Sequence, residues 1–274
     1  MRVGFIGAGN MGGALIKGYS DKLDLREAGI EQVDIFVYDA DAGKAKEFAK
    51  PPIVQVVESI SDLYENSDAI VICVKPQIID LVLEELAGCA QNMSGKLVVS
   101  IAAGVSIGHI QSKLGVDTKV VRVMPNTPAM VGEGMSALSV GGTGLSEDEL
   151  RSVEGLFSSV GKIVWVEEKF MDIVTGISGS SPAYAYMYME GLINAGVAEG
   201  LTREAATVLA AQSTLGAAKM VLESGVDPVQ LRINVCSPGG TTIEAVKVFE
   251  EEGFIETVEK AAGASAAKSK AMTK

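Results

Sequence analysis

Short runs of β-branched and other apolar residues alternate with helical segments from the start of the chain to about residue 166. The runs lie at residues 2–6, 34–38, 69–74, 97–101, 120–124 and 163–166. Short strands separated by helices are typical of βαβ units and of a parallel sheet. Because residues 69–74 are apolar at every position, helices should cover both faces of that strand. The pattern therefore predicts an α/β Rossmann-type fold with a doubly wound parallel sheet.

The composition changes after residue 166, where Ala, Met and Gly replace the β-branched residues. Ser181 before Pro182 resembles an N-cap followed by the first position of a helix. Comparable boundary signals predict further helices, over residues 202–224, from about 227 and from about 243. We therefore predict two domains, a Rossmann domain over residues 1–163 and an all-helical domain over residues 164–274.

The expected helix over residues 181–200 is apolar nearly all round and contains the run Tyr-Ala-Tyr-Met-Tyr-Met at residues 184–189. A helix without a polar face has no side for water, so this run indicates a core or an interface more than an aromatic box for a ligand. We expect a homodimer, which can assemble into a larger homo-oligomer. Gly196 and Gly200 are four residues apart and would permit close approach of helices.

Charge and composition exclude several classes of partner. The formal net charge of -12 at pH 7 opposes binding to nucleic-acid phosphates, which requires Lys and Arg. His109 is the only histidine and the three cysteines are widely spaced, which argues against a metal site and against a disulfide framework. No apolar run reaches the roughly 18 residues of a membrane span, and a strand rather than a leader begins the sequence. We expect a cytoplasmic protein with no nucleic-acid, membrane or metal partner.

A glycine-rich segment follows the first expected strand and opens a helical stretch. In that position the pattern G-x-G-x-x-G indicates a dinucleotide site, although a glycine turn without a ligand would look the same. The first glycine permits a tight turn, the second lets the backbone approach a pyrophosphate, and the third lets helix and strand pack closely. The N-terminus of the helix then presents free N–H groups to the diphosphate. The expected cofactor-binding residues are Gly7, Ala8, Gly9, Asn10, Met11 and Gly12.

Asp39 follows the second expected strand directly. An acidic residue at this place accepts hydrogen bonds from the ribose hydroxyls of NAD and repels the 2′-phosphate of NADP. Asp39 therefore favours NADH over NADPH. A solvated turn formed by Asp39 and Asp41 explains the same residues.

Two further loops follow strands at the edge where doubly wound sheets bind ligands. Val74, Lys75 and Pro76 lie in the first loop, and Ala102 and Ala103 lie in the second. Lys75 is placed to contact the nicotinamide ribose, while the small alanines leave room for the ring. The alternative for Lys75 is a solvated lysine at the end of a strand.

The segment Ser-Pro-Gly-Gly-Thr-Thr at residues 237–242 precedes another expected helix. Its glycines let successive N–H groups converge, its threonines supply hydroxyls, and the helix dipole adds positive potential, which together suit a carboxylate. The alternative, an ordinary N-cap after a proline turn, explains one threonine but not the whole run. The expected substrate-binding residues are Ser237, Gly239, Gly240, Thr241 and Thr242.

The chain resembles the pyrroline-5-carboxylate reductases, the enzymes that make proline, along nearly its whole length. The resemblance is carried by residues 7–12, 74–77, 100–104, 122–128, 176–184 and 235–242. The last segment is the most specific, because many dehydrogenases share the glycine pattern. Two residues depart from the family. Ser181 stands where glycine is common, and Asp39 stands where many members that prefer NADPH carry a neutral or basic residue.

This resemblance implies an oxidoreductase that reduces 1-pyrroline-5-carboxylate to L-proline by hydride transfer from NADPH or NADH, the last step of proline biosynthesis. It also implies a helical dimerisation domain and an active site in the cleft between domains. As the catalytic residue, Thr242 would hydrogen-bond the ring nitrogen of the substrate. Gly240 and Thr241 would help to hold the carboxylate, and Asn234 would lie near the cofactor.

Other functions share part of these signals. Another imine reductase or a 3-hydroxy acid dehydrogenase of the same build would share the Rossmann features. The hydroxy-acid enzymes typically use a catalytic lysine in the helical domain, for which Lys219 and Lys247 are candidates. A catalytically silent dinucleotide sensor would not need an intact segment at residues 237–242.

Overall fold

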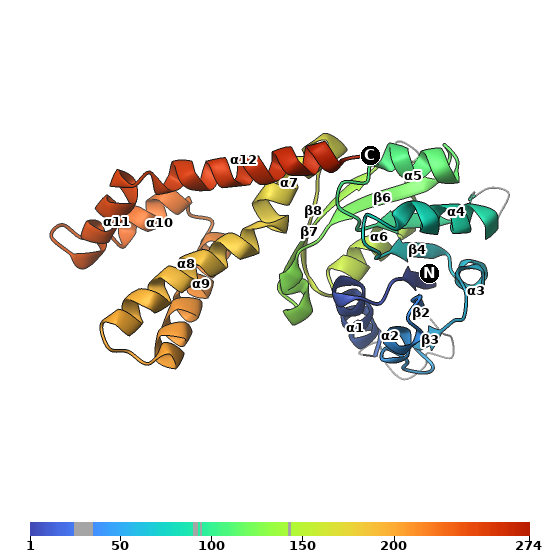
Figure 1. Ribbon diagram of the computed structural model, residues 1–274, viewed down its shortest axis with the longest axis horizontal. Helices are drawn as coiled ribbons and strands as arrows, with labels where there is room; N and C mark the ends of the chain where they lie inside the picture. Colours follow the sequence, from blue (N-terminus) through green and yellow to red (C-terminus); the bar gives the residue numbers. More distant parts are fainter. Residues whose placement is uncertain (25–34, 90–92, 94, 142–143) are drawn as a thin grey trace. The chain divides into compact units, whose positions relative to one another are not determined.

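A computed structural model describes residues 1–24, 35–89, 93, 95–141 and 144–274 of the chain (Figure 1). The chain divides into two compact units. Residues 1–180 and 264–274 form the sheet unit, and residues 181–263 form the helical unit. The predicted Rossmann-type sheet followed by helices is confirmed. The expected domain boundary between residues 163 and 164 falls inside the last strand of the sheet.

The described residues form one eight-stranded sheet in the order β3-β2-β1-β4-β5-β6-β7-β8. The strand order reverses between β1 and β4, and doubly wound sheets bind ligands outside the carboxyl ends of the strands at such a point. Neighbouring strands are parallel except for β6 and β7, which are antiparallel. The strands are β1 Val3–Ile6, β2 Ile35–Tyr38, β3 Val54–Val56, β4 Ala69–Ile72, β5 Leu97–Ser100, β6 Lys119–Met124, β7 Gly134–Val140 and β8 Gly161–Trp165.

Two strands, β3 and β7, are missing from the sequence-based expectation. Strand β3 has three residues at the edge of the sheet, and β7 contains glycine, methionine and serine instead of a β-branched run. Because β7 is antiparallel to β6, the expectation of a wholly parallel sheet is corrected. Strand β4 ends at Ile72, two residues earlier than expected. Residue 34 of the second expected strand lies outside the described residues.

Helices cover both faces of the sheet, as the continuous apolar run of β4 predicts. All four residues of β4 are buried. Ala69 and Val71 join an apolar cluster with α1 and α6, whereas Ile70 and Ile72 join a second cluster with α3, α4 and α5. The helices of this unit are α1 Asn10–Asp24, α2 Ala42–Lys46, α3 Ile60–Asn66, α4 Ile79–Cys89, α5 Ile107–Leu114, α6 Glu147–Phe157 and α7 Met171–Val174.

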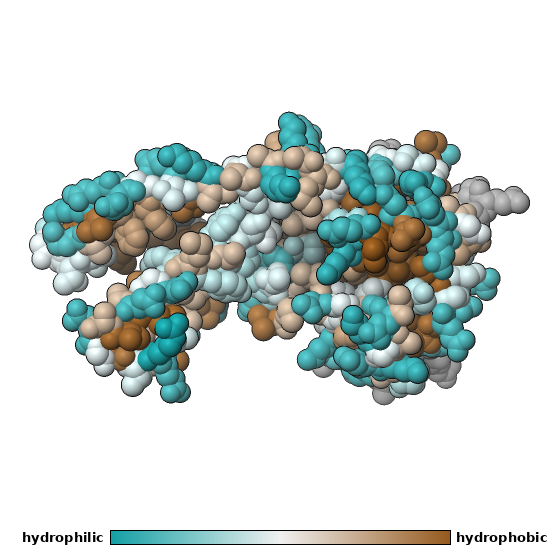
Figure 2. Space-filling view, in the orientation of Figure 1, coloured by the Kyte–Doolittle hydropathy of each residue, from teal (hydrophilic) through white to brown (hydrophobic). Residues whose placement is uncertain are grey.

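The helical unit leaves many large apolar side chains on its surface. Within one chain, α8, α10 and α11 contain no buried residue among the residues described. Met187 on α8 is 72% exposed, and Figure 2 shows apolar residues in brown on these helices. The helices are α8 Ser181–Ala198, α9 Arg203–Ser224, α10 Pro228–Asn234, α11 Thr241–Glu251 and α12 Phe254–Met272, of which α12 continues into the sheet unit.

The structure corrects one helix cap in this unit and places Gly196 between two helices of the same chain. Ser181 is the first residue of α8 rather than its N-cap, because the chain is already helical from Met171 to Gly179. A Cβ atom at Gly196 would lie 3.2 Å from Cβ of Ala206. Gly196 therefore permits α8 and α9 of the same chain to pack closely.

Helix α9 is long and apolar enough, by length and composition, to cross a membrane. Its mean hydropathy reaches 1.2 over an 18-residue window, of which 11% is buried. Lys219 near its C-terminal end forms an exposed ion pair with Glu223. Exposed apolar surface of this extent is also what an oligomer interface requires.

Candidate functional site

The glycine-rich turn after β1 is packed tightly at two of its three glycines. Gly7 has φ of 103° and donates its N–H to the carbonyl oxygen of Tyr38 at 2.8 Å. A Cβ atom at Gly12 would overlap the carbonyl oxygen of Gly7. At Gly9, by contrast, no atom of the described residues other than Gly9 and its two neighbours lies within 4 Å of the position a Cβ would take. Gly7 and Gly12 are therefore needed by the fold, while the backbone at Gly9 is open to a ligand.

Asp39 holds the glycine turn from the end of β2. Its Oδ2 accepts the N–H of Ala8 at 2.7 Å, and its Oδ1 accepts the N–H of Asp41 at 2.8 Å. Asp41 in turn caps α2 by accepting the N–H of Gly43 at 3.0 Å. The solvated-turn interpretation is therefore correct for Asp41, while the Asp39 carboxylate is fixed beside the turn on which a diphosphate is expected.

A pocket of about 390 Å³ adjoins the glycine turn. It includes two lysines that the sequence motif does not reveal, one on α1 and one on α2. Lys17 lies four residues after Gly13 and so shares its face of α1. This spacing is the sequence signal that could have identified Lys17 as a pocket residue. The other lining side chains come together only through tertiary packing. The lining residues are Ala8, Gly9, Asn10, Gly13, Ala14, Lys17, Lys44, Glu47, Phe48 and Met130.

The loops after β4 and β5 lie at the carboxyl edge of adjacent strands. Val74 and Pro76 are half-buried, and Lys75 is exposed at the strand end. Ala102 is 3% exposed and belongs to the apolar core, so its side chain faces away from solvent. Ala103 is half-buried. Of the two alanines, Ala103 is the one available to a ligand.

The turn before α11 leaves its hydroxyl groups unused. Helix α11 begins at Thr241, two residues earlier than expected, with Gly240 as an N-cap that has no side-chain hydrogen bond. Thr241 and Thr242 are exposed, and in the part of the chain that the structure describes neither hydroxyl is hydrogen-bonded. The turn is closed by the N–H of Gly240, which donates to the carbonyl oxygen of Ser237 at 3.0 Å. The N-cap alternative for a threonine is therefore wrong.

The two groups of expected site residues belong to different units. Asn234 ends α10 and accepts a hydrogen bond from Gln230 at 2.8 Å. It lies in the helical unit with residues 237–242, whereas the other cofactor residues lie in the sheet unit. Lys247 is 2.7 Å from Glu244 in an exposed ion pair. Like Lys219, it is held by a carboxylate on its own helix.

The cysteines and the histidine take no part in these groups. Cys73, Cys89 and Cys236 are free thiols on half-buried residues. His109 is on α5, with Nε2 2.6 Å from Oδ1 of Asp80.

Comparison with known proteins matches both parts of the chain. Residues 168–272 match the family described as "Pyrroline-5-carboxylate reductase dimerisation", and residues 2–104 match the family described as "NADP oxidoreductase coenzyme F420-dependent". Pyrroline-5-carboxylate reductase of Escherichia coli (strain K12) is 40% identical over 253 residues, which cover 92% of this chain and 91% of that protein. The corresponding protein of Glycine max is 40% identical over 271 residues, with 99% and 96% covered.

Solved structures agree over the full length. A pyrroline-5-carboxylate reductase from Coxiella burnetii has a TM-score of 0.90 at 35% identity, with 100% of this chain and 98% of that chain covered. The Plasmodium falciparum pyrroline carboxylate reductase with NADP bound has a TM-score of 0.84 at 36% identity, with the same coverage. The chain therefore belongs to the pyrroline-5-carboxylate reductase family.

Proposed function

We propose that this protein reduces 1-pyrroline-5-carboxylate to L-proline with NADPH or NADH, as the last step of proline biosynthesis. The observation that carries the proposal, beside family membership, is the turn at residues 237–242. It offers free hydroxyl groups and the N-terminus of an 11-residue helix at one point of the surface. A small carboxylate matches that arrangement. Lys219 and Lys247, the candidates for the lysine of a hydroxy-acid dehydrogenase, are both exposed and each pairs with a glutamate on its own helix.

The residues of the sheet unit fit a dinucleotide. The open backbone at Gly9 and the N-terminus of α1 would receive the diphosphate, with Gly7, Ala8, Asn10, Met11 and Gly12 around them. Asp39 would face the adenosine ribose. Val74, Lys75, Pro76, Ala103 and Asn234 would line the nicotinamide side, with the buried Ala102 supporting the loop behind Ala103. When bound, the reduced nicotinamide supplies a hydride, that is, a hydrogen nucleus together with two electrons.

The residues of the helical unit would hold the imino acid for that hydride. Gly239, Gly240 and Thr241 with Ser237 would bind the carboxylate. The substrate can arrive already protonated on the ring nitrogen, so the new C–H bond forms at the iminium carbon and the C=N electron pair moves to nitrogen. Thr242 would hydrogen-bond that nitrogen and keep its proton in place. The protein therefore contributes mainly proximity and orientation.

We propose further that the protein is a homodimer in the cytoplasm, open to larger assembly. The match of residues 168–272 to a dimerisation family and the exposed apolar side chains of α8 and α9 support the dimer. A partner covering α9 would account for its hydropathy without a membrane. Three unpaired cysteines are typical of a reducing compartment. On this view residues 1–163 bind the dinucleotide, and residues 164–274 serve dimerisation and substrate binding.

A steady-state assay with pyrroline-5-carboxylate and each cofactor in turn tests the proposed reaction. We expect the absorbance of the reduced nicotinamide to fall as it is consumed, with formation of an equimolar amount of L-proline. Turnover of a 3-hydroxy acid in its place, or binding of the dinucleotide without turnover of either substrate, would reject the proposal.

Cofactor choice should depend on Asp39. We expect NADH to be used at least as well as NADPH by the wild type, because the carboxylate repels a 2′-phosphate. Asp39→Ser should shift the ratio of kcat/KM values toward NADPH. A wild type that prefers NADPH by about tenfold or more, which is about 1.4 kcal/mol, would refute the assignment.

Gly9→Ala should weaken cofactor binding without unfolding the protein. Apart from Gly9 and its two neighbours, the added methyl group meets no atom within 4 Å in the part of the chain that the structure describes, but it would stand where the diphosphate is expected. We expect a Kd about tenfold higher by titration of cofactor fluorescence, about 1.4 kcal/mol, and an almost unchanged melting temperature. Gly155→Ala on α6, where the Cβ position is equally open, is the matched control. Equal Kd values for the two variants would show that the diphosphate does not approach Gly9.

A further inference from the structure

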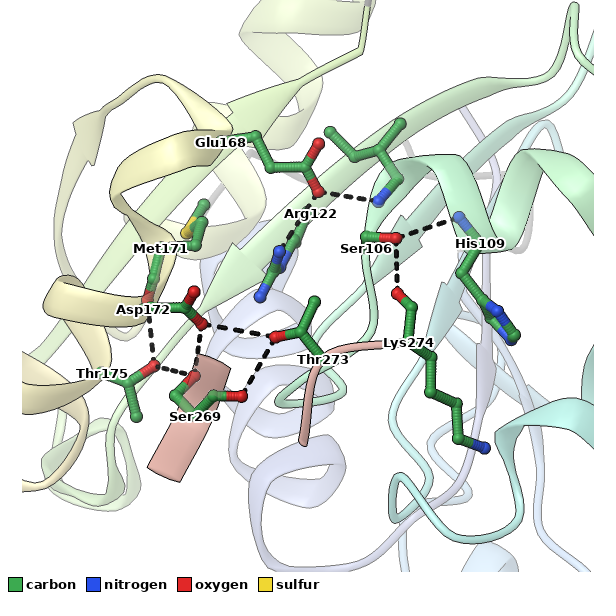
Figure 3. Close-up of polar contacts among 11 residues, drawn as sticks. Ser106, His109, Arg122, Glu168, Met171, Asp172, Thr175, Ser269, Thr273 and Lys274 are labelled. Carbon is green, nitrogen blue, oxygen red and sulfur yellow. Dashed lines mark hydrogen bonds and ion pairs between the residues drawn. The ribbon is translucent and has the colours of Figure 1, made fainter. Parts of the chain in front are cut away.

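The end of α12 is bonded to the loop between β5 and α5, which contains Ala102 and Ala103 (Figure 3). Lys274 donates its N–H to the carbonyl oxygen of Gly104 at 3.0 Å. Ser106 donates its hydroxyl to the backbone oxygen of Lys274 at 2.7 Å and also caps α5. Gly104 has φ of 70°, and a Cβ there would lie 3.2 Å from the carbonyl oxygen of Met272. The loop and the end of α12 are therefore in direct backbone contact.

The same end of α12 is fixed to the rest of the sheet unit by side chains. Ser269, which is 7% exposed, donates its hydroxyl to Oδ1 of Asp172 at 2.7 Å. Thr273 donates its hydroxyl to the carbonyl oxygen of Ser269 at 3.0 Å. Lys274 Nζ is 2.6 Å from Oδ2 of Asp80. Hydrogen bonds from Lys274 and His109 lower the pKa of Asp80 to about 2. This end of the helix is thus anchored on α7 and on α4.

On its other side the loop is held by Glu168. One oxygen, Oε1, accepts the N–H of Ile107 at 2.8 Å and lies 3.2 Å from Nη1 of the buried Arg122 (Figure 3). A carboxylate at the first residue of α5 also suits the positive end of that helix dipole. The loop therefore sits between two fixed groups, Glu168 on one side and the end of α12 on the other.

We propose that residues 269–274, which we call the strap, position the β5–α5 loop for hydride transfer. The inference rests on the proposed function, which places the nicotinamide beside Ala103. Ala102 and Val105 anchor the loop in the apolar core, but between them Gly104 lies in the left-handed region, where the backbone has little stiffness of its own. The hydrogen bond from Lys274 to the carbonyl oxygen of Gly104 holds this part of the loop. None of the strap residues is among the expected cofactor- or substrate-binding residues, so they act as positioning residues.

The test uses a pair of substitutions at Lys274. Lys274→Pro removes the N–H that Gly104 accepts, together with the side chain. Lys274→Ala removes the side chain and keeps the N–H. We expect Lys274→Pro to lower kcat about tenfold, since small misplacements of reacting groups cost much rate, and Lys274→Ala to stay within about twofold of wild type.

Two further measurements separate positioning from general stability. With cofactor deuterated at the transferred position, the isotope effect on kcat should rise in Lys274→Pro, because hydride transfer becomes more rate-limiting. ADP-ribose, which lacks the nicotinamide, should bind all variants equally. A lower melting temperature with unchanged kcat and isotope effect, or equal loss of ADP-ribose binding, would overturn the proposal.

A replacement variant and a second binding measurement cover two ways in which this test could fail. If Lys274→Pro does not fold, Ser106→Ala is used in its place, because it removes the hydrogen bond from Ser106 to Lys274. Ser106→Thr keeps a hydroxyl at this position and is its control. Only Ser106→Ala should slow hydride transfer. If the wild type does not reduce pyrroline-5-carboxylate, the proposed function fails separately. The strap is then tested by comparing the Kd of each variant for NADPH and NADH with its Kd for ADP-ribose. Selective loss of dinucleotide affinity in Lys274→Pro supports the strap, and equal losses overturn it.

Discussion

Met187→Glu is expected to convert the dimer into monomers at micromolar concentration. Met187 is 72% exposed on α8 within one chain, and the dimer would cover it. An unpaired charge buried in an interface costs about 3–5 kcal/mol, and two-fold symmetry introduces the charge twice. Light scattering or sedimentation should therefore report the mass of one chain for the variant and of two or more for the wild type.

Leu81→Glu is the matched control for this prediction. Leu81 is 67% exposed on α4 of the sheet unit, so the same change adds the same charge outside the helical unit. Its assembly state should remain that of the wild type. A wild type that is itself a monodisperse monomer at micromolar concentration is incompatible with the proposed dimer. Gly196→Glu is less suitable, because it would clash with Ala206 and Leu201 of its own chain.

Thr242→Val should slow turnover strongly and leave the fold intact. Valine keeps the shape of threonine but removes the hydroxyl that would bond the ring nitrogen. A hydrogen bond to a charged group is worth about 1.5–3 kcal/mol, so losing the bond that orients the protonated ring nitrogen should lower kcat/KM roughly ten- to hundredfold. Cofactor affinity should change much less. Kinetics, cofactor titration and thermal unfolding on the same variant provide the measurement.

The substrate-binding role of Thr242 and a helix-capping role predict different effects on stability. Gly240 is the N-cap of α11 and makes no side-chain hydrogen bond, so removing the Thr242 hydroxyl should cost little stability. A capping threonine would instead lose about 0.5–2 kcal/mol of stability. Thr242→Ser keeps the hydroxyl and should retain most of the turnover. Turnover near that of wild type in Thr242→Val would leave substrate binding to the backbone amides and Thr241.

Sequence patterns predict the features of this fold that depend on residues close together in the chain. The continuous apolar run of β4 predicts burial on both faces, and the spacing of Gly7, Gly9 and Gly12 predicts the turn after β1. Strand β7 escapes prediction because its pairing with β6 and β8, not its composition, makes it a strand. The contact of Gly104 with Met272 joins residues far apart in the sequence, and no local pattern marks it.

The site shows the same division. The run at residues 237–242 indicates an anion site from its residue types alone, but which residue caps α11 depends on the backbone path at Gly240. Lys17 and Lys44 come beside the glycine turn because α1 and α2 are placed there by the sheet. The place of Asp39 after β2 predicts its role beside a ribose. Its bond to Ala8 cannot be predicted in this way, since it requires the turn to fold back on β2.

The return of residues 264–274 to the sheet unit has a consequence for synthesis on the ribosome. Domains usually fold as units while the chain emerges, the N-terminal one first. Here the first unit lacks its last segment until all of residues 181–263 have been made, so the β5–α5 loop waits without its contacts to Met272 and Lys274. Contacts between such distant residues form slowly. A nascent chain stalled before residue 264 should therefore hold a formed sheet whose β5–α5 loop is open to protease, and release of the remaining residues should close it.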